Sequence, residues 1–465
     1  MSIVAQKEVP DKPLSRGEFC QQQQELLHQM IREAIIPQVS RIFNQALCAE
    51  VTNWLGRDKG QHRASVTATV SSLQCPVCGR RETLDFVRKG YYERGVVTQW
   101  GLAPLAMPRV KCVCGHSPTI PFSLLAPYDR LWSDMDGLSL EYTALSLSLR
   151  STVTVLERIS DQAISIGTVQ RRVKGTARVA TAHLQQKVTD SPAVIMVDGL
   201  WGTVMQDTGR KKKDKKGRLR KVKGAKKVPV LVAFGVDPHT GKKTVLAWVQ
   251  ATAEDLAGWT RLLTALHERG VHWQSGLRLF IHDGSRGLEA AWEMVDFGPV
   301  RRQRCVFHKL KNVVRAVVGS ETMTREEKKE RVKAVLTDAC TIYQAATAAE
   351  ARQRASAFGA TWIDREPKAV ATIERDFEQT LTCYAVQEQA QAAGQMWLLS
   401  SLRSTSALER FNRSLRTKWR QAGAFWSEDG QTGAFWLVSA RQMRDKEVGS
   451  TDWLDAIIAA HLEPD

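Results

Sequence analysis

The sequence predicts a multi-domain α/β protein, in which a mixed sheet with helices is interrupted by an all-α insertion and preceded by two smaller modules. Three observations lead to this prediction. The 465 residues exceed what one hydrophobic core normally holds. Strand-like and helix-like patterns are mixed between residues 190 and 315, and two closely spaced cysteine pairs lie upstream of them. Because 43% of the residues are hydrophobic, there is enough apolar material to bury.

Residues 1–60 are expected to form a helical region. Between residues 19 and 55, apolar side chains recur at helical spacing, at Leu26, Leu27, Met30, Ile31, Ile35, Val39, Ile42 and Phe43. This stripe could pack on the same chain or on a partner. A homo-oligomer is therefore one hypothesis.

Residues 61–125 contain two thiol pairs, in Cys75-Pro-Val-Cys78-Gly and Cys112-Val-Cys114-Gly. Four thiolates on glycine-bearing turns suit tetrahedral Zn²⁺, so we predict a zinc-ribbon-like module with a structural zinc ion. The second pair is spaced Cys-x-Cys where Cys-x-x-Cys is usual, so His116 could replace one ligand. Disulfide pairing is the alternative.

The other features of the chain that bear on its compartment point to a reducing cytoplasm. Cys20, Cys48, Cys340 and Cys383 show no pairing pattern. The first eight residues lack the long apolar stretch of a secretory signal, and no run approaches the length of a membrane span. We therefore expect a cytoplasmic protein without membrane contact.

Residues 126–185 are expected to be helical. Helix patterns at 140–149 and 153–159 are followed by a break at 165–167 and by a basic helix that Thr168 would cap. This arrangement is compatible with a helix-turn-helix, whose second helix would enter the major groove of DNA. A packing element of three helices would show the same pattern, so both interpretations stay open.

The α/β core is expected at 190–315 and 397–435. An apolar run ends at Asp198, and strand-like segments follow at 228–236 and 243–249. Asp255 would begin an amphipathic helix, and a second apolar run ends at Asp283. The predicted order is strand, strand, strand, helix, strand, helix. Between the two parts of this core, residues 316–396 lack turn clusters and predict an all-helical insertion, and 436–465 predict a C-terminal helical tail.

Three acidic residues have settings that suit metal ligands. Asp198 and Asp283 end buried runs, so each carboxylate would be held rigidly at the rim of a sheet. Glu409 lies on an amphipathic helix. Mg²⁺ prefers a few oxygen ligands, and two such ions can stabilise the attacking and leaving oxygens of an in-line phosphoryl transfer. The alternatives are Asp-Gly turns after the strands and a capping box between Ser406 and Glu409.

Two groups of basic residues could hold phosphates. On the helix of Glu409, the apolar positions Leu408, Phe411, Leu415 and Trp419 would face the sheet, and Asn412 and several arginines would line the neighbouring face. Residues 210–227, between the first two strands, carry twelve Lys or Arg against one Asp and account for most of the net charge of +17. This loop is either a solvated hairpin tip or a salt-sensitive clamp on the DNA backbone. The candidate DNA contacts are Lys211, Lys212, Lys213, Lys215, Lys216, Arg218, Arg220, Lys221, Arg413, Arg416 and Arg420.

The order of the core elements, with acids on the first and fourth strands and on a later helix, resembles the ribonuclease H-like core of DDE transposases. Several motifs are similar to the mutator-type family of prokaryotic insertion-sequence transposases, over roughly residues 192–430. They are Val197-Asp198-Gly199-Leu200, Gly258-Trp259, Asp283-Gly284-x-x-Gly287-Leu288, the run from Arg302 to Asn312, and the run from Arg403 to Asn412.

The resemblance implies roles for particular residues. Asp198, Asp283 and Glu409 would form a metal-binding triad, with Asp198 bridging two Mg²⁺ or Mn²⁺ ions and the other acids completing one ion each. Cys305-x-x-His308 would be the Cys/His motif near the active site. Spacing alone favours a packed cysteine beside a surface histidine, and we interpret the pair as structural or close to DNA, not as a metal site. The helical insertion would help to grip DNA ends.

The leading hypothesis is therefore a transposase that binds the terminal repeats of a mobile element. It would cut a strand with metal-activated water and join the freed 3′ hydroxyl to target DNA, as a homo-oligomer on DNA in the prokaryotic cytoplasm, associated with the nucleoid. One alternative is a metal-dependent nuclease with the same core but no strand transfer. Another is a zinc-ribbon DNA-binding regulator whose triad is idle.

Overall fold

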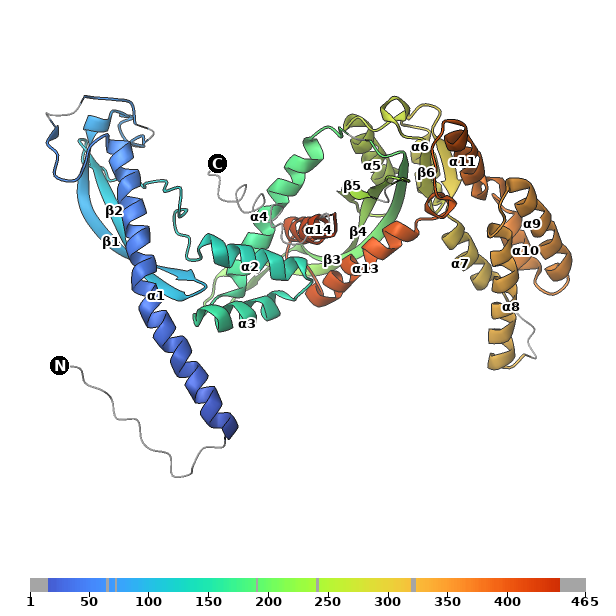
Figure 1. Cartoon of the computed structure of the whole chain (residues 1–465), viewed down its shortest axis with the longest axis horizontal. Coiled ribbons are helices and arrows are strands. Elements are labelled where there is room, and N and C mark those ends of the chain that lie inside the picture. Colours follow the sequence, from blue (N-terminus) through green and yellow to red (C-terminus); the bar gives the residue numbers. More distant parts are fainter. Residues whose placement is uncertain are drawn as a thin grey trace. The chain divides into compact units, whose positions relative to one another are not determined.

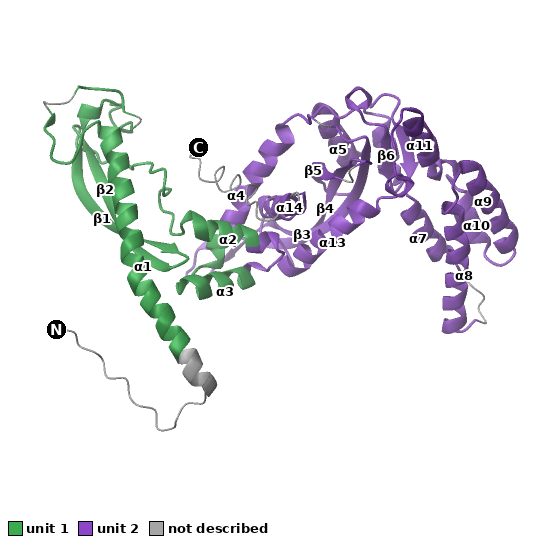
Figure 2. Ribbon diagram, in the orientation of Figure 1, with its two compact units in different colours: residues 1–141, 150–169, 454–465 green, residues 142–149, 170–453 purple. Residues whose placement is uncertain are grey.

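The computed structural model describes residues 16–63, 67–71, 73–189, 191–239, 242–318 and 323–443. The chain divides into two compact units (Figure 2). Unit 1 comprises Met1–Glu141, Arg150–Val169 and Leu454–Asp465, and unit 2 comprises Tyr142–Leu149 and Gln170–Trp453. Among the described residues, none of the helices is both long and apolar enough to cross a membrane.

Unit 1 is built on a long helix and a β-hairpin (Figure 1). Helix α1 spans Arg16–Leu55, and β1 (Phe86–Thr98) pairs antiparallel with β2 (Gly101–Cys112). The short 3-10 helix η2 (Thr83–Asp85) leads into β1. The core forms where the C-terminal part of α1 packs on the hairpin, and its buried residues include Phe43, Leu47, Val51, Leu55, Val96, Leu105 and Met107.

The apolar stripe predicted on α1 is divided in the structure. Phe43 contributes to the core of unit 1, whereas Leu26, Leu27 and Met30 are each at least 50% exposed. Only the C-terminal part of the stripe is therefore explained by packing within the chain, and its docking on a partner stays a prediction.

Three helices follow the hairpin: α2 (Ser133–Ala144), α3 (Leu149–Ser160) and α4 (Ile166–Gln185). The predicted continuous helix at 140–149 is wrong, because the backbone of Ser146 is left-handed, with φ of 70°, and separates α2 from α3. The predicted cap is also shifted. The Ser165 hydroxyl accepts a hydrogen bond from the Thr168 backbone N–H at 3.1 Å, so Ser165 caps α4.

Unit 2 contains a five-stranded mixed sheet with the order β5-β4-β3-β6-β7. The first three strands of unit 2, β3, β4 and β5, form an antiparallel meander. The last two, β6 and β7, run parallel to β3. The predicted strand and helix order is observed, with β7 in addition. The strands are β3 (Val194–Lys213), β4 (Leu219–Val236), β5 (Lys243–Gln250), β6 (Leu279–His282) and β7 (Arg301–Arg304).

Helices cover both faces of this sheet (Figure 1). On one face, Ile195 and Val197 pack with α5 (Leu256–Glu268) and α6 (Arg286–Trp292) in a continuous core, and the 3-10 helix η3 (Trp273–Ser275) follows α5. On the other face, Phe234 contacts Phe411 of α13 (Ser406–Ala422), with ring centroids 4.9 Å apart. Trp248 contacts Phe435 of α14 (Glu428–Met443) at 5.0 Å.

The basic segment between the first two strands is not a loop. Strands β3 and β4 continue into it as a paired ribbon, with Lys211 opposite Lys221 and Lys212 opposite Arg220. A tight turn closes the ribbon, where the Asp214 carboxylate accepts hydrogen bonds from the backbone N–H groups of Lys216 and Arg218. The hydrogen bonds to Asp214 therefore close a long β-hairpin in place of the expected loop. We call residues 204–226 of this hairpin the basic arm.

Between β7 and α13 the described chain is helical. After α7 (Val306–Ala316), the helices α8, α9, α10 and α11 lie next to one another beyond β6 and β7 (Figure 1). The predicted C-terminal tail lies within α14 as far as Met443, and residues 444–465 lie outside the described part. The remaining bounds are α8 (Arg325–Tyr343), α9 (Ala348–Trp362), α10 (Pro367–Glu374), η4 (Glu378–Thr380), α11 (Thr382–Ala392) and α12 (Leu399–Leu402).

Candidate active site

Asp198 and Asp283 lie where β3 and β6 separate. The two strands pair in parallel from Val194 to Met196 on β3, and Asp198 is the second residue beyond that pairing. Asp283 directly follows the last residue of β6. The prediction that β3 ends at Asp198 is wrong, because β3 continues for fifteen residues to Lys213 along β4. Asp198 nevertheless lies at an edge, because only one neighbouring strand accompanies β3 from this point.

A glycine follows each of the two aspartates, but the structural reason for glycine differs between the two positions. A Cβ on Gly199 would lie 2.3 Å from the Glu254 carboxylate, so glycine makes room for that side chain within a continuing strand. The Asp-Gly turn is therefore wrong at Asp198. It is right at Asp283, where Gly284 has φ of 77° and Arg304 occupies the place that a side chain would take.

Glu409 reaches the site because the start of α13 is attached to the end of β7. The backbone N–H of Thr405 donates to the Cys305 sulfur at 3.3 Å, and the N–H of Val306 donates to the Arg403 carbonyl at 3.0 Å. Thr405 is the N-cap residue, and no side chain caps the helix. The predicted capping box between Ser406 and Glu409 is therefore wrong. The Glu409 carboxylate is instead available for contacts with other side chains of the site.

The structure brings Asp198, His308 and Glu409 together, with one ligand atom of each within 4.8 Å of the others. The Asp198 carboxylate accepts hydrogen bonds from its neighbour's backbone N–H at 2.9 Å and from Asn412 Nδ2 at 3.0 Å. Glu409 Oε1 lies 3.4 Å from His308 Nε2, and Oε2 lies 3.3 Å from an Arg416 nitrogen. Each carboxylate is thus held in place by partners on neighbouring elements.

Asp283 lies outside this group of three. Its Oδ1 accepts a hydrogen bond from the Ser285 backbone N–H at 2.9 Å, within its own turn. Its charge still acts on the site, because it helps to raise the pKa of Asp198. Two of the three predicted acids are therefore in the cluster and the third is near it.

The pKa values of the three groups in the cluster are shifted in different directions. Burial and the nearby charge of Glu409 raise the pKa of Asp198 to about 7. Contact with His308 lowers the pKa of Glu409 to about 2, against the effect of burial, and Arg416 adds to the lowering. Burial opposes the charge on His308, but Cys305, Glu409 and Asp198 outweigh it and raise its pKa to about 10. A histidine cation therefore lies between acidic groups that would otherwise repel each other.

Sequence reasoning missed Glu254. It precedes the N-cap residue of α5, and its side chain covers Gly199 on the opposite face of β3 from the Asp198 side chain, as strand alternation requires. Burial raises the pKa of Glu254, a contact with Trp201 lowers it, and the charge of Asp283 raises it. The only sequence signal was an acid just before a helix start, which is too common to be informative.

A sequence profile described as Transposase, Mutator family, matches residues 38–443. The chain belongs to this family. Similar proteins include the transposase for insertion sequence element IS406 of Burkholderia multivorans, 28% identical over 352 residues that cover 75% of this chain and 80% of the relative. The transposase for IS905 of Lactococcus lactis is 24% identical over 74% of this chain and 76% of that protein.

A third relative is the transposase for IS256 in transposon Tn4001 of Staphylococcus aureus, which is 24% identical over 79% of this chain and 83% of its own. Among solved structures, the Drosophila P element transposase strand transfer complex matches with a TM-score of 0.38 and 11% identity. The match covers 71% of this chain and 94% of that one.

A second cluster in this Mutator-family chain consists of thiols. Cys75, Cys78, Cys112 and Cys114 each have a sulfur atom within 4.8 Å of the others. Cys75 faces Cys114 at 3.6 Å and Cys78 faces Cys112 at 3.6 Å, well beyond the 2.05 Å length of a disulfide bond. His116 is not part of the group. The donor set matches the four thiolates that structural Zn²⁺ prefers.

The predicted DNA contacts lie on two elements, the basic arm and α13. Lys211, Lys212, Lys213 and their neighbours on β4 are exposed on the basic arm. Arg413 and Arg420 are exposed on α13, whereas Arg416 reaches Glu409. The base of the arm is attached to the chain before α14, where the backbone N–H of Met205 donates to the Phe425 carbonyl at 2.7 Å.

Proposed function

We propose that the protein is a DDE transposase that binds the ends of a mobile element, cuts a DNA strand and joins the 3′ end to target DNA. The observation that carries this proposal is the convergence of the Asp198 and Glu409 carboxylates, from residues far apart in the chain, beside Asp283. Membership of the Mutator family supports it, as do the insertion-sequence transposases among the relatives. The strand order of unit 2, with the acids on its first and fourth strands, suits a ribonuclease H-like core.

The residues present fit divalent metal ions. Asp198 and Glu409 offer carboxylate oxygens, and Asn412 Oδ1 is buried without a hydrogen-bond partner in the described structure. Such hard oxygen donors are the ligands that Mg²⁺ and Mn²⁺ prefer. Asp198, Glu409 and Asp283 would hold the ions. When bound, the ions would supply an activated water and stabilise charge on the transferred phosphate.

The chain's own side chains would orient these ligands. Asn412 fixes the Asp198 carboxylate through a 3.0 Å hydrogen bond, and His308 and Arg416 hold the two oxygens of Glu409. Because these partners lie on α7 and α13, the geometry is set before DNA arrives. The pair Cys305 and His308 would thus act by positioning Glu409 and by balancing charge, not as metal ligands.

DNA is the proposed partner. The basic arm and the exposed arginines of α13 would contact phosphates of the terminal repeats or the target, and the thiol cluster would hold zinc and stabilise the module that carries it. The α3 and α4 pair would form a helix-turn-helix, whose second helix, α4, would enter the major groove. Assembly as a homo-oligomer on DNA remains part of the proposal.

The test is a strand-transfer assay with a pre-cut, labelled element end and plasmid target. Wild-type protein should give Mg²⁺-dependent joined products, and Asp198→Asn should reduce joining by about a thousandfold or more while DNA binding is retained. Asp296→Asn is the matched control, since Asp296 lies exposed in a turn of unit 2, where it accepts a hydrogen bond from the Gly298 backbone N–H at 2.8 Å that Asn can keep, and it should retain full activity. Cutting without joining would support the nuclease instead. Binding without any cutting would support the regulator.

A further inference from the structure

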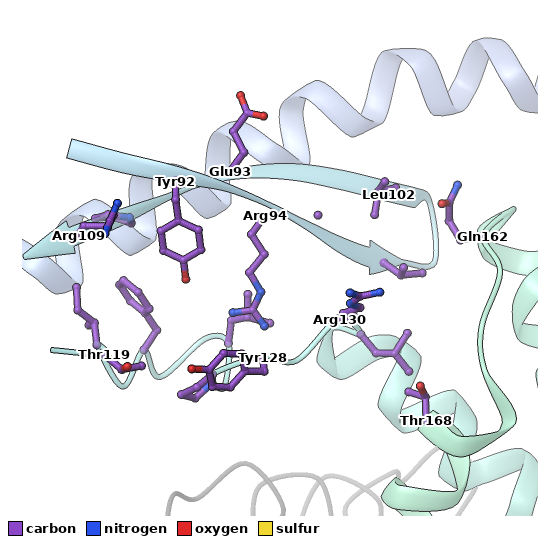
Figure 3. Close-up of a pocket in the computed structure, with 18 of the residues that line it drawn as sticks. Tyr92, Glu93, Arg94, Leu102, Arg109, Thr119, Tyr128, Arg130, Gln162 and Thr168 are labelled. Atoms are coloured by element: carbon purple, nitrogen blue, oxygen red, sulfur yellow. The ribbon is translucent and has the colours of Figure 1, made fainter. Parts of the chain in front are cut away.

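Unit 1 contains a cavity of about 1050 Å³ that none of the roles proposed above uses (Figure 3). One wall is the β1–β2 hairpin, which contributes Arg94 and Arg109. The opposite wall is segment 117–131, which contributes Tyr128 and Arg130. The turn between α3 and α4 closes one end, with Gln162 and Thr168 among the lining residues. The volume is at the upper end of the range of about 300–1000 Å³ that is typical of ligand pockets.

The cavity combines an apolar floor with exposed aromatic rings. Ile120, Phe122 and Leu125 are buried in the core beneath it. Tyr128 is 90% exposed and has φ of 64°, a left-handed conformation that residues with a side chain rarely adopt. Its ring therefore contributes nothing to the core, yet a strained backbone presents it at the cavity. Strain of this kind is concentrated at functional sites.

The charged lining favours an anion. Three arginines, at 94, 109 and 130, line the cavity together with one carboxylate, Glu93. The Arg94 guanidinium donates to the backbone carbonyl of Ala126 at 3.1 Å and to that of Asp129, and so holds the segment on either side of Tyr128. Arginine donors suit phosphate oxygens, and an exposed tyrosine ring suits the face of a planar base.

We propose that this cavity binds an unpaired nucleotide of the DNA, an inference that rests on the proposed function for its choice of partner. Stacking on Tyr128 would hold the base, and the arginines would hold the adjoining phosphates. A base within a duplex is paired and stacked between its neighbours, so its face cannot reach Tyr128, and the occupant must be an unpaired nucleotide. Since Thr168 belongs to α4, the unpaired nucleotide would lie next to the helix that we expect to contact the flanking duplex.

The test uses full-length protein and a labelled single-stranded oligothymidylate, followed by fluorescence anisotropy at a salt concentration that suppresses binding by the basic arm. Tyr128→Ala should weaken binding by at least about fivefold, the lower end of the loss for one stacked base, and Tyr128→Phe should retain it. Tyr128→Gly removes the ring but suits a left-handed backbone, so it should fold at least as well as wild type and still bind weakly. Tyr91→Ala is the matched control, because Tyr91 is 45% exposed on β1 of the same unit and does not line the cavity.

Equal binding by wild type and Tyr128→Gly would overturn the inference, as would an equal loss in Tyr91→Ala. Photo-crosslinking of an iodouridine-substituted oligonucleotide should label the peptide that contains Tyr128. The two proposals fail separately. Tyr128-dependent binding without strand transfer by wild type would refute only the catalytic proposal, whereas strand transfer with no effect of Tyr128 would refute only the nucleotide site.

Discussion

The two candidate metal clusters of this chain are built in opposite ways. The thiol cluster comes from two short turns on either side of one hairpin, so each pair of ligands is fixed by local backbone geometry. The acidic cluster takes Asp198 from a strand, His308 from one helix and Glu409 from another, and only packing of the whole unit brings them together. From this difference we predict that the first cluster needs its ion to fold, whereas the second is held by protein contacts before an ion binds.

The strongest test of this contrast is removal of the thiol ligands. Cys112→Ser should abolish zinc binding and unfold much of unit 1, because a structural zinc ion contributes about 10–16 kcal/mol to folding in small modules. Zinc content by elemental mass spectrometry and limited proteolysis of residues 67–125 measure the effect. Cys340→Ser, in a half-buried position of unit 2, is the control. Full protection from protease without bound zinc would contradict the prediction.

Replacement of Glu409 should have the converse effect, with activity lost and the fold retained. Glu409→Gln preserves shape but removes the charge that would bind metal, so strand cleavage should fall by about a hundred- to a thousandfold. The melting temperature should change little, because α13 is held by Leu408, Phe411 and Leu415. Cleavage above a tenth of the wild-type rate would show that Glu409 is not a ligand.

Replacement of His308 should lower activity less than replacement of Glu409, because Arg416 also contacts the Glu409 carboxylate. His308→Gln should lower the cleavage rate by about tenfold and raise the Mg²⁺ concentration needed for half-maximal activity, as expected for loss of a group that orients a ligand. A metal titration at saturating DNA measures both. His239→Gln, which alters a histidine that contacts Trp397, should leave both unchanged.

Replacement of lysines in the basic arm should have the smallest effect of the four changes when DNA binding is measured at low salt. Combined replacement of Lys211, Lys212 and Lys213 by Gln should reduce the slope of log affinity against log salt by up to about 0.9 per lost phosphate contact. Duplex binding measured across several salt concentrations gives the slope. Lys243→Gln with Arg261→Gln removes exposed charge from β5 and α5 and should leave the slope unchanged. An unaltered slope in the arm variant would indicate that the arm does not contact DNA.

The sequence predicted most of what local patterns determine. Helix α5 has the expected N-cap, where Asp255 accepts from the Gly258 backbone N–H. Of the apolar face predicted for this helix, Trp259, Leu262, Leu263 and Leu266 are buried, but Leu256 is 43% exposed. The hairpin of β4 and β5, the apolar face of α13 and the convergence of the four thiols also follow from short motifs. Each of these depends on residues close together in the chain or on one repeating period.

What the sequence could not predict depends on contacts between distant elements. The strand β3 was expected to stop at Asp198, because glycine after aspartate usually marks a turn, and only the position of Glu254 explains why glycine is needed within a strand. The place of His308 beside Glu409 depends on the link from Thr405 to Cys305, a hundred positions apart. Asp283 lies outside the cluster, and its carboxylate instead accepts a hydrogen bond from the Ser285 backbone N–H in the turn after β6.

The continuity of β3 has a geometric consequence. One strand, with a register irregularity between Asp207 and Lys211, carries both the Asp198 carboxylate and the lysines near the tip of the arm, fifteen residues away. At about 3.3 Å per residue, the strand separates them by at most roughly 50 Å, or nearly one and a half turns of B-form DNA. A paired ribbon bends far less than a loop, so under the proposed function the fold itself would set how far along the double helix from the scissile bond the arm contacts DNA.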